Sequence, residues 1–175
     1  MRKAALLLLS VCIISFIKLP ASACTIFAAT GTDFVQGGGS LIAKTRDWDL
    51  QPNGVGLYEP EGGNRFYAIE ANNDPSAMKP RGGINEKGLA VVQSAASCVP
   101  DDILRKVRHK GNVISDLLSR CDNVKEAIAM LNGYGGQNIL LADKNEIALI
   151  EIAPNGSRDV RRLNKGGYLY HTNHY

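Results

Sequence analysis

After residue 23, the sequence has no surplus of positive or of negative charge. The whole chain holds 20 Lys and Arg against 17 Asp and Glu, a formal net charge of +3. The excess lies within residues 1–23, which contain Arg2, Lys3 and Lys18 and no acidic residue. Residues 24–175 therefore carry 17 charges of each sign. Nucleic-acid-binding domains usually show a basic excess, so this balance argues against a nucleic-acid partner.

No apolar run is long enough to span a bilayer comfortably. The longest, residues 4–17, is shorter than the roughly 20 residues that a membrane-spanning helix needs. Two basic residues precede it, Pro20 follows it, and residues 21–23 (Ala-Ser-Ala) fit the small-residue rule for cleavage on export. We therefore predict a signal peptide over residues 1–23 and a periplasmic or secreted domain over residues 24–175. A retained membrane anchor fits less well, and we expect no stable membrane insertion after cleavage.

A lipoprotein signal is an alternative interpretation of the same segment. In that case Cys24 is lipidated after cleavage and anchors a binding protein. Ala21 stands where such signals usually carry Leu. The difference matters because an acylated Cys24 cannot act as a nucleophile.

Cysteine is scarce, and the cysteines of the mature chain are odd in number. Cys12 leaves with the predicted signal peptide, so Cys24, Cys98 and Cys121 remain. An odd count in an exported protein indicates one special thiol and at most one disulfide. Cys98 and Cys121 are either bridged or two separate buried thiols.

The sequence has no internal repeat, low-complexity run or linker, so we predict one domain. Two segments have helical periodicity, 113–121 and 124–131, with Asn123 and Glu126 as a capping pair, and a short helix begins near residue 100. Residues 50–63 are loop or edge structure, and residues 72–83 are loop. The predicted strands cover residues 25–30, 40–47, 65–70, 89–93, 138–142, 146–152, 158–162 and 167–172.

The strand pattern predicts a layered α/β sandwich. Residues 89–93 are mostly apolar, which indicates burial on both faces, with helices outside the sheets. The first two strands would form a hairpin, and this hairpin would bring residues 46–49 back beside Cys24.

Neither a phosphate loop nor a metal site is evident. The turn at residues 37–39 is all glycine, but no Gly-Lys-Ser/Thr follows it. His171 and His174 do not have zinc-ligand spacing relative to a cysteine. We predict no cofactor and no metal.

Cleavage after Ala23 would make Cys24 the first residue of the mature chain. A free thiol has a pKa of about 8.5 and needs help to ionise at neutral pH. A free α-amine has a pKa of about 7.7–8.0, which suits a general base. Amide cleavage by a thiol needs a nucleophile and a base, and Cys24 would then supply both.

Charged residues after the second predicted strand fit this hypothesis. Asp49 can orient an N-terminal ammonium through a charge-assisted hydrogen bond, and Arg46 can favour a thiolate. Ordinary solvated charges are the alternative interpretation. Trp48, the only tryptophan, would line a substrate pocket or pack in the core.

Five motifs occur in order along the mature chain: Cys24-Thr25, residues 46–49 (Arg-Asp-Trp-Asp), residues 83–89 (Gly-Ile-Asn-Glu-Lys-Gly-Leu), residues 138–143 (Asn-Ile-Leu-Leu-Ala-Asp) with Glu151, and residues 171–174 (His-Thr-Asn-His). Taken together, these motifs resemble those of the N-terminal-nucleophile (Ntn) hydrolases that cut linear amides, and they occur in the order of that family. This group includes choloylglycine hydrolases, penicillin V acylases and acyl-coenzyme A:6-aminopenicillanate acyltransferases, and the resemblance is greatest to the last. It covers essentially the whole mature chain.

The resemblance implies a fold, a reaction and roles for site residues. The fold would be the αββα four-layer sandwich, incomplete at its C-terminal end. The substrate would be a small N-acyl amide, and the resemblance leaves open whether the chain forms a homo-oligomer. Cys24 would be nucleophile and base, Asp49 would orient its amine with Arg46 beside it, and Asn173 would help to form the oxyanion hole.

The chain also departs from the family pattern. Family members often carry an asparagine where this chain has residues 93–95 (Gln-Ser-Ala), so the second oxyanion donor is open and could be a backbone amide. Members also continue past the Thr-Asn motif and use a later arginine that no residue here matches. Two rival interpretations follow: an inactive, truncated remnant of the family, and a papain-like enzyme that pairs a cysteine with His171.

Overall fold

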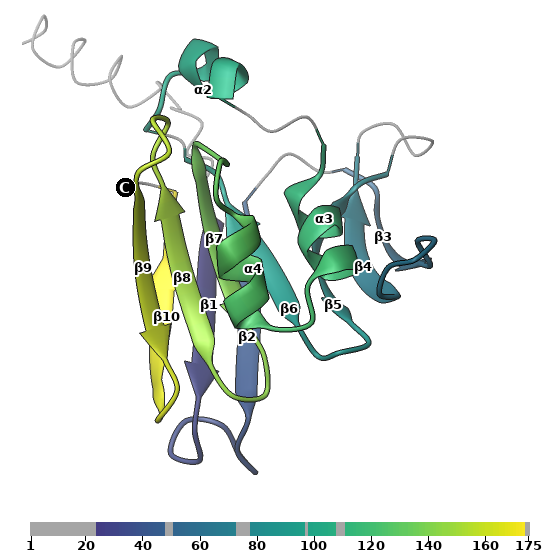
Figure 1. Ribbon diagram of the computed structural model, residues 1–175, viewed down its shortest axis with the longest axis vertical. Coiled ribbons are helices and arrows are strands. Elements are labelled where there is room, and N and C mark those ends of the chain that lie inside the picture. The colour runs from purple at the N-terminus through teal and green to yellow at the C-terminus, as the bar shows by residue number, and fades with distance from the viewer. Residues whose placement is uncertain (1–23, 48–50, 73–77, 97, 108–110, 174–175) are drawn as a thin grey trace, which may run out of the picture.

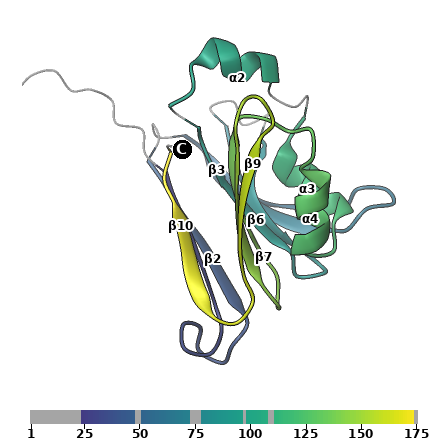
Figure 2. The same ribbon diagram turned by 60° about the vertical axis from the view of Figure 1, so that its left-hand side comes forward.

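The computed structural model describes residues 24–47, 51–72, 78–96, 98–107 and 111–173, which form two antiparallel β-sheets and three helices (Figure 1). The signal peptide predicted for residues 1–23 lies outside this part of the chain. The two sheets lie face to face, and helices α3 (Val113–Arg120) and α4 (Val124–Met130) cover the outer face of the larger one (Figure 2). The described residues therefore form helix, sheet and sheet layers, as the layered α/β prediction requires.

The smaller sheet has the strand order β10-β1-β2, and the larger has the order β3-β4-β5-β6-β7-β8-β9. The third helix, α2 (Asp101–Val107), follows β6. The strands are β1 Cys24–Thr30, β2 Ser40–Arg46, β3 Asn53–Tyr58, β4 Phe66–Ala71, β5 Pro80–Asn85, β6 Ala90–Ser94, β7 Gln137–Ala142, β8 Ile147–Ile152, β9 Arg158–Leu163 and β10 Gly167–His171.

The hairpin predicted at the start of the domain is confirmed. β1 pairs with β2 along its whole length, from Cys24 opposite Arg46 to Thr30 opposite Ser40. Side chains on an antiparallel pair alternate between the two faces, so every second residue of β1 enters the space between the sheets. Ile26 and Ala28 are fully buried there, whereas Phe27 is exposed on the other face.

One prediction about the larger sheet was wrong. Residues 72–83 were expected to be loop, but β5 begins at Pro80 and pairs with both β4 and β6. Proline is acceptable as the first residue of a strand, and glycines in a strand permit close approach of a neighbour. Gly83 uses that freedom, since it lies beneath Leu118 of α3.

The two amphipathic helices form where the periodicity predicts. Both begin with an asparagine N-cap: the Oδ1 of Asn112 accepts from Ser115 N at 3.1 Å, and that of Asn123 accepts from Glu126 N at 3.0 Å. The predicted capping pair is thus present, and Glu126 in turn accepts from Asp122 N at 2.8 Å.

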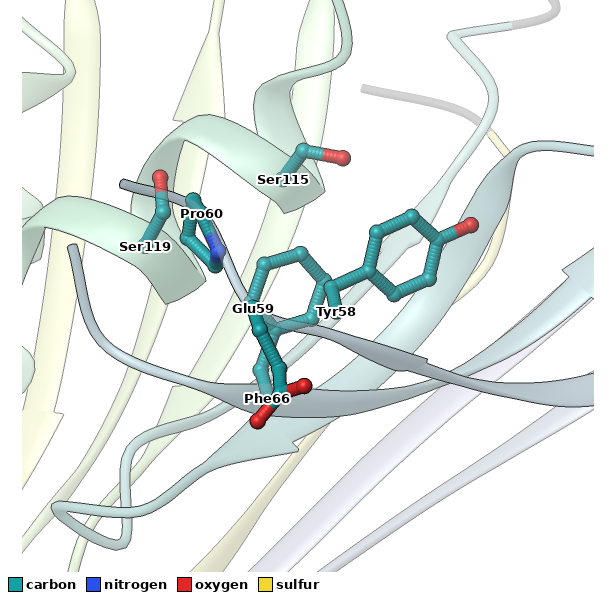
Figure 3. A pocket seen from close by; sticks show the side chains of 6 residues that line it. All are labelled: Tyr58, Glu59, Pro60, Phe66, Ser115 and Ser119. Carbon is teal, nitrogen blue, oxygen red and sulfur yellow. The ribbon is translucent and has the colours of Figure 1, made fainter. Parts of the chain in front are cut away.

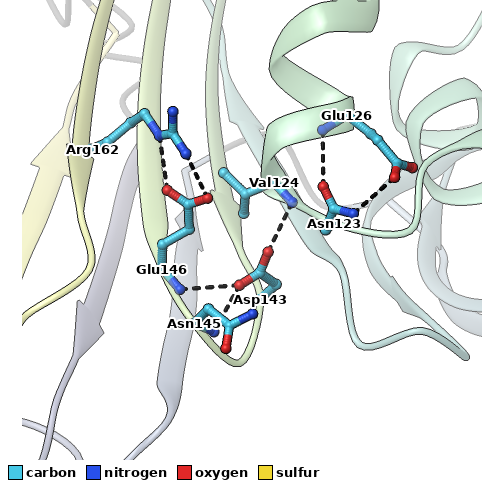
Figure 4. A network of polar contacts seen from close by, with 7 residues as sticks. All are labelled: Asn123, Val124, Glu126, Asp143, Asn145, Glu146 and Arg162. Carbon is cyan, nitrogen blue, oxygen red and sulfur yellow. Dashed lines mark hydrogen bonds and ion pairs between the residues drawn. The ribbon is translucent and has the colours of Figure 1, made fainter.

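Asp143, in the turn after β7, ties α4 to the larger sheet (Figure 4). Its carboxylate accepts from Val124 N at 2.9 Å, from Asn145 N at 2.7 Å and from Glu146 N at 3.0 Å. The side chain is buried, so these charge-assisted bonds compensate for its desolvation. This part of the 138–143 motif therefore has a structural role.

Two apolar clusters hold the layers together. The larger lies between the helices and the seven-stranded sheet, and its helix residues include Ile114, Leu117 and Leu118, all fully buried. Each such side chain stabilises the fold by about 1.5–3 kcal/mol. The smaller cluster lies between the sheets and contains Ile26, Ala28, Ala90, Leu140, Ala142, Ile147 and Leu149.

The outer face of the smaller sheet is uncovered in the described part of the chain. It presents the large side chains of Phe27, Leu41, Tyr168 and Tyr170 to solvent. The ring centroid of Tyr168 lies 6.2 Å from that of Phe27 and 6.4 Å from that of Tyr170. A second helical layer, as in the four-layer fold predicted from the sequence, would lie on this face.

The cysteines other than Cys24 take no part in the space between the sheets. Cys98 is exposed and Cys121 is buried beneath α3 and α4, and both are free thiols. Burial raises the pKa of Cys121 to about 11, so this thiol is a core residue rather than a nucleophile. Within the described residues, no helix is long and apolar enough to cross a membrane.

We expect Gly83→Ala to lower the free energy of unfolding by about 1–3 kcal/mol, because overpacking forces the neighbouring backbone to move. A Cβ at this position would lie 2.3 Å from Tyr67 O and 2.9 Å from Leu118 Cδ1. Urea denaturation measures the change. Gly54→Ala on β3 is the control, since its Cβ would meet nothing closer than 3.6 Å and should change stability by less than about 0.5 kcal/mol. Equal effects of the two substitutions would contradict the packing argument.

Candidate functional site

The space between the sheets is apolar along most of its length and polar at one end. Beyond the smaller apolar cluster, the inward-facing positions of both sheets carry polar side chains. We name this group the inter-sheet polar cluster. It consists of Cys24, Lys44, Arg46, His171 and Asn173 on the side of the smaller sheet, and Ser94, Asn138 and Glu151 on the larger sheet.

Polar contacts join the two sheets across this cluster. Lys44 Nζ on β2 donates to Gln93 O on β6 at 2.6 Å. Ser94 Oγ on β6 donates to Thr172 O, just after β10, at 2.8 Å. His171 Nε2 on β10 lies 3.3 Å from Glu151 Oε1 on β8. Each bond fixes one strand of the smaller sheet against the larger sheet.

Cys24 is the middle residue of the line of inward-facing polar side chains that crosses the smaller sheet. β1 is the central strand, so Cys24 has β2 on one side and β10 on the other. Arg46 is its partner on β2, and the β10 register places Asn173 on the other side. Cys24 is only 1% exposed. The hairpin thus brings Arg46 beside the cysteine as the sequence predicted.

The nitrogen of Cys24 has a specific acceptor. It donates to Asn173 Oδ1 at 3.1 Å, across 149 positions of sequence, and both residues are buried. The carboxamide of Asn173 also carries an NH₂ group, which is a hydrogen-bond donor. The structure therefore brings two of the predicted site residues into contact.

Arg46 is anchored to the larger sheet by its guanidinium. Its Nη1 donates to Asn53 Oδ1 on β3 at 2.7 Å, so the side chain bridges the smaller sheet and the edge of the larger one. The other predicted residues of this segment, Trp48 and Asp49, lie outside the described residues, as does His174.

Lys44 is a member of the cluster that the sequence did not single out. The pKa of Lys44 is lowered to about 8, chiefly by burial and also by repulsion from Arg46 and Arg81, while Coulomb attraction to Cys24 opposes the change. A buried ammonium is unusual unless it has partners. The alternation of β2 provides the missing signal, because it places Ile42, Lys44 and Arg46 on one face.

His171 is held in a network of its own. Its Nε2 faces Glu151, which also pairs with Arg161 on β9, and its Nδ1 contacts Thr172 O. Both ring nitrogens are therefore engaged by groups other than Cys24. This geometry suits a structural link between β10 and β8 better than a proton acceptor for a thiol.

Asn138 is the most buried polar side chain of the cluster, with no exposed surface. Its Nδ2 donates to Ala95 O at 3.5 Å, and its Oδ1 has no hydrogen-bond partner among the described residues. A buried carbonyl without a donor costs about 1–3 kcal/mol, so the position is suited to a ligand N–H.

The residues at 93–95, where the second oxyanion donor was left open, divide between the two faces of β6. Gln93 pairs with Ile139 of the helix-side cluster, so its side chain lies on the helix side of the sheet. Ser94 faces the inter-sheet polar cluster, where its hydroxyl donates to Thr172 O.

Two surface hollows lie away from this cluster. One of ≈ 280 Å³ lies between β3, β4 and α3, and Figure 3 shows the residues that line it: Tyr58, Glu59, Pro60, Phe66, Ser115 and Ser119. Another, of ≈ 350 Å³, lies near Tyr67 and Ile84. Within the described part of the chain, no group of His, Cys, Asp and Glu is arranged to hold a metal ion.

Comparison with known proteins relates the chain to acyl-transfer enzymes. The family described as acyl-coenzyme A:6-aminopenicillanic acid acyl-transferase matches residues 35–175. The structure of penicillin V acylase from Agrobacterium tumefaciens is similar, with a TM-score of 0.37 and 13% identity over 81% of this chain and 42% of that chain. The chain thus spans less than half the length of that acylase. None of the curated proteins matches the chain.

We expect Lys44→Met to raise the free energy of unfolding by about 1–2 kcal/mol at pH 7. The folded-state pKa of about 8 lies below the usual 10.5, so the folded chain holds the Lys44 proton less tightly than the unfolded chain. The loss of folding stability that results from this pKa difference is greatest below pH 8 and decreases as the pH rises toward 10.5. The lost bond to Gln93 O offsets part of the gain.

Urea denaturation at pH 7 and pH 10 measures this difference, which should be smaller at the higher pH. Lys165→Met, at an exposed lysine between β9 and β10, is the matched control and should be nearly neutral at both values. A loss of stability in Lys44→Met at pH 7 would contradict the prediction.

Proposed function

Because the chain belongs to the acyl-coenzyme A:6-aminopenicillanic acid acyl-transferase family, we propose that it is an exported Ntn cysteine amidase or acyltransferase that cleaves a linear amide C–N bond. One observation supports this most directly. The nitrogen of Cys24 is held at 3.1 Å by the buried side chain of Asn173, while Arg46 flanks the same cysteine from the other strand. A buried backbone nitrogen needs an acceptor, and at Cys24 a side chain 149 positions away supplies it.

The proposed reaction starts with removal of residues 1–23 during export, which frees the α-amine of Cys24. That amine takes the proton of the Cys24 thiol, and the sulfur attacks the carbonyl carbon of the substrate amide. The C–N bond then breaks, and the α-ammonium gives its proton to the leaving nitrogen. The acyl group stays on sulfur as a thioester until water or another acceptor takes it and restores the thiol.

Asn173 serves the reaction at both ends of its carboxamide in this proposal. Its Oδ1 orients the Cys24 nitrogen, as the 3.1 Å contact allows. Its NH₂ donates to the oxygen on which negative charge develops during attack. We also propose that Asp49 orients the freed ammonium, that Arg46 favours the thiolate, and that the unpartnered Asn138 Oδ1 accepts from the N–H of the substrate.

The proposed substrate is a small N-acyl amide, and residues 24–175 would act in the periplasm or the medium without a cofactor or metal. Penicillin V, an N-acyl homoserine lactone and a glycine-conjugated bile salt sample this class.

We expect Cys24→Ala to reduce amide cleavage by at least about 10³-fold, since it removes the nucleophile. Inserting one glycine before Cys24 should be equally harmful, because it moves the free amine off the cysteine. Release of amine from the three amides above measures both variants, and mass spectrometry confirms each N-terminus. Cys98→Ala, at an exposed thiol, is the control and should keep wild-type activity. A glycine-extended protein with full activity, or a lipidated Cys24, would overturn the proposal.

We expect Asn173→Ala to reduce kcat by about 10²–10³-fold, the usual effect of removing one oxyanion donor. Steady-state assays with the best of the three amides measure it. Asn164→Ala, at an exposed asparagine in the β9–β10 turn, is the matched control and should leave kcat unchanged. The role would be wrong if Asn173→Ala changed only KM.

A further inference from the structure

We propose that Lys44 is a positioning residue of this site, whose ammonium holds the sulfur of Cys24 in its thiolate form. The catalytic benefit of this role rests on the proposed function. The effect of Lys44 on the sulfur rests only on its position and charge. Lys44 belongs to none of the motifs that led to the nucleophile.

The register of the smaller sheet places Lys44 within reach of the sulfur. Cys24 is opposite Arg46, and Ile26 is opposite Lys44, so Lys44 is the diagonal neighbour of Cys24 on the same face. Diagonal neighbours of an antiparallel pair lie about 7–8 Å apart, a gap that a four-carbon lysine stem can close. Both side chains enter the space between the sheets, where the field of a charge is screened less than in water.

A hydrogen bond to the larger sheet fixes where the ammonium lies. Nζ donates to Gln93 O at 2.6 Å, which directs the stem across the gap between β2 and β6. A backbone carbonyl is a neutral partner, so an anion near the ammonium would stabilise its charge further.

The charges around Lys44 favour an anion at Cys24. Arg46 on its own strand and Arg81 on β5 both repel the ammonium, and Cys24 on β1 attracts it. Arg81 is held by its Nε donating to Ala71 O at 3.2 Å. A thiolate at Cys24 would face the cations Lys44 and Arg46 together. The thiol proton goes to the α-amine in the proposed reaction, so Lys44 acts through its charge and transfers no proton.

A purely structural Lys44 is the competing explanation, in which the side chain only ties β2 to β6. The two explanations differ in what they predict for the sulfur. A structural tie affects folding stability alone, whereas a charge beside sulfur changes the pH at which Cys24 becomes reactive toward an alkylating agent.

The test is the pH dependence of Cys24 alkylation by iodoacetamide, measured on the full chain after export and processing. Peptide mass spectrometry follows Cys24 separately, and the exposed Cys98 serves as an internal reference in the same samples. Lys44→Met should move the alkylation curve of Cys24 upward by about one pH unit and slow its alkylation at pH 7 by about 10-fold. Lys44→Arg should keep the wild-type alkylation rate at pH 7, where both side chains carry a positive charge.

Matched variants make each outcome decisive. Lys165→Met removes an exposed lysine and should leave Cys24 unchanged, and the Cys98 curve should not move in any variant. Lys44→Gln repeats the charge removal with a side chain that can still donate to Gln93 O, in case the methionine variant is misfolded. A folded Met or Gln variant with the wild-type Cys24 curve overturns the proposal.

Alkylation does not require amide cleavage, so the experiment separates this inference from the proposed function. A shifted curve in a protein that cleaves no amide would leave the Lys44–Cys24 pair in place and reject the enzyme. An unshifted curve in an active amidase would reject the role of Lys44 alone.

Discussion

The central constraint in this structure is the antiparallel pairing of β1 with a strand on each side. β2 supplies Arg46 and Lys44, β10 supplies His171 and the approach to Asn173, and Cys24 lies between them. The larger sheet closes the space from the other side through Ser94 and Glu151. Every contact of the inter-sheet polar cluster depends on these strands keeping their register, because a shift of one residue would turn each inward side chain outward.

The division of the inter-sheet space into an apolar part and a polar end follows from the same alternation. Ile26 and Ala28 continue the inward row of β1 that begins at Cys24, and they pack against Leu140 and Leu149. Burial of the apolar part stabilises the fold, and this offsets the cost of burying polar groups. Lys44 and Asn138 are polar groups of this kind, and neither is explained by folding stability alone, which is a common property of functional sites.

Local features of the fold were predictable from the sequence, and distant ones were not. The first hairpin, the helices and the Asn123–Glu126 cap depend on residues close together in the chain, so their patterns were sufficient. β5 was missed because Pro80 and two glycines resemble a loop, and only packing against α3 explains the glycine at 83. The pairing of β10 with β1 joins residues about 140 positions apart, and no local pattern specifies it.

The site shows the same division. Cys24, Arg46 and Asn173 were singled out by motif, and the structure brings them together. Lys44 was missed because a lysine in a strand is usually solvated, and its burial depends on a sheet that forms far along the chain.

The separation of 149 positions between Cys24 and Asn173 has a consequence for the order of folding. Contacts between distant segments form late in folding, since chain entropy must be overcome before they contribute. A growing polypeptide therefore carries Cys24 before it carries the asparagine that accepts from its nitrogen. That contact arises only when β10 docks beside β1, so the topology itself sets when the nitrogen of Cys24 gains this acceptor.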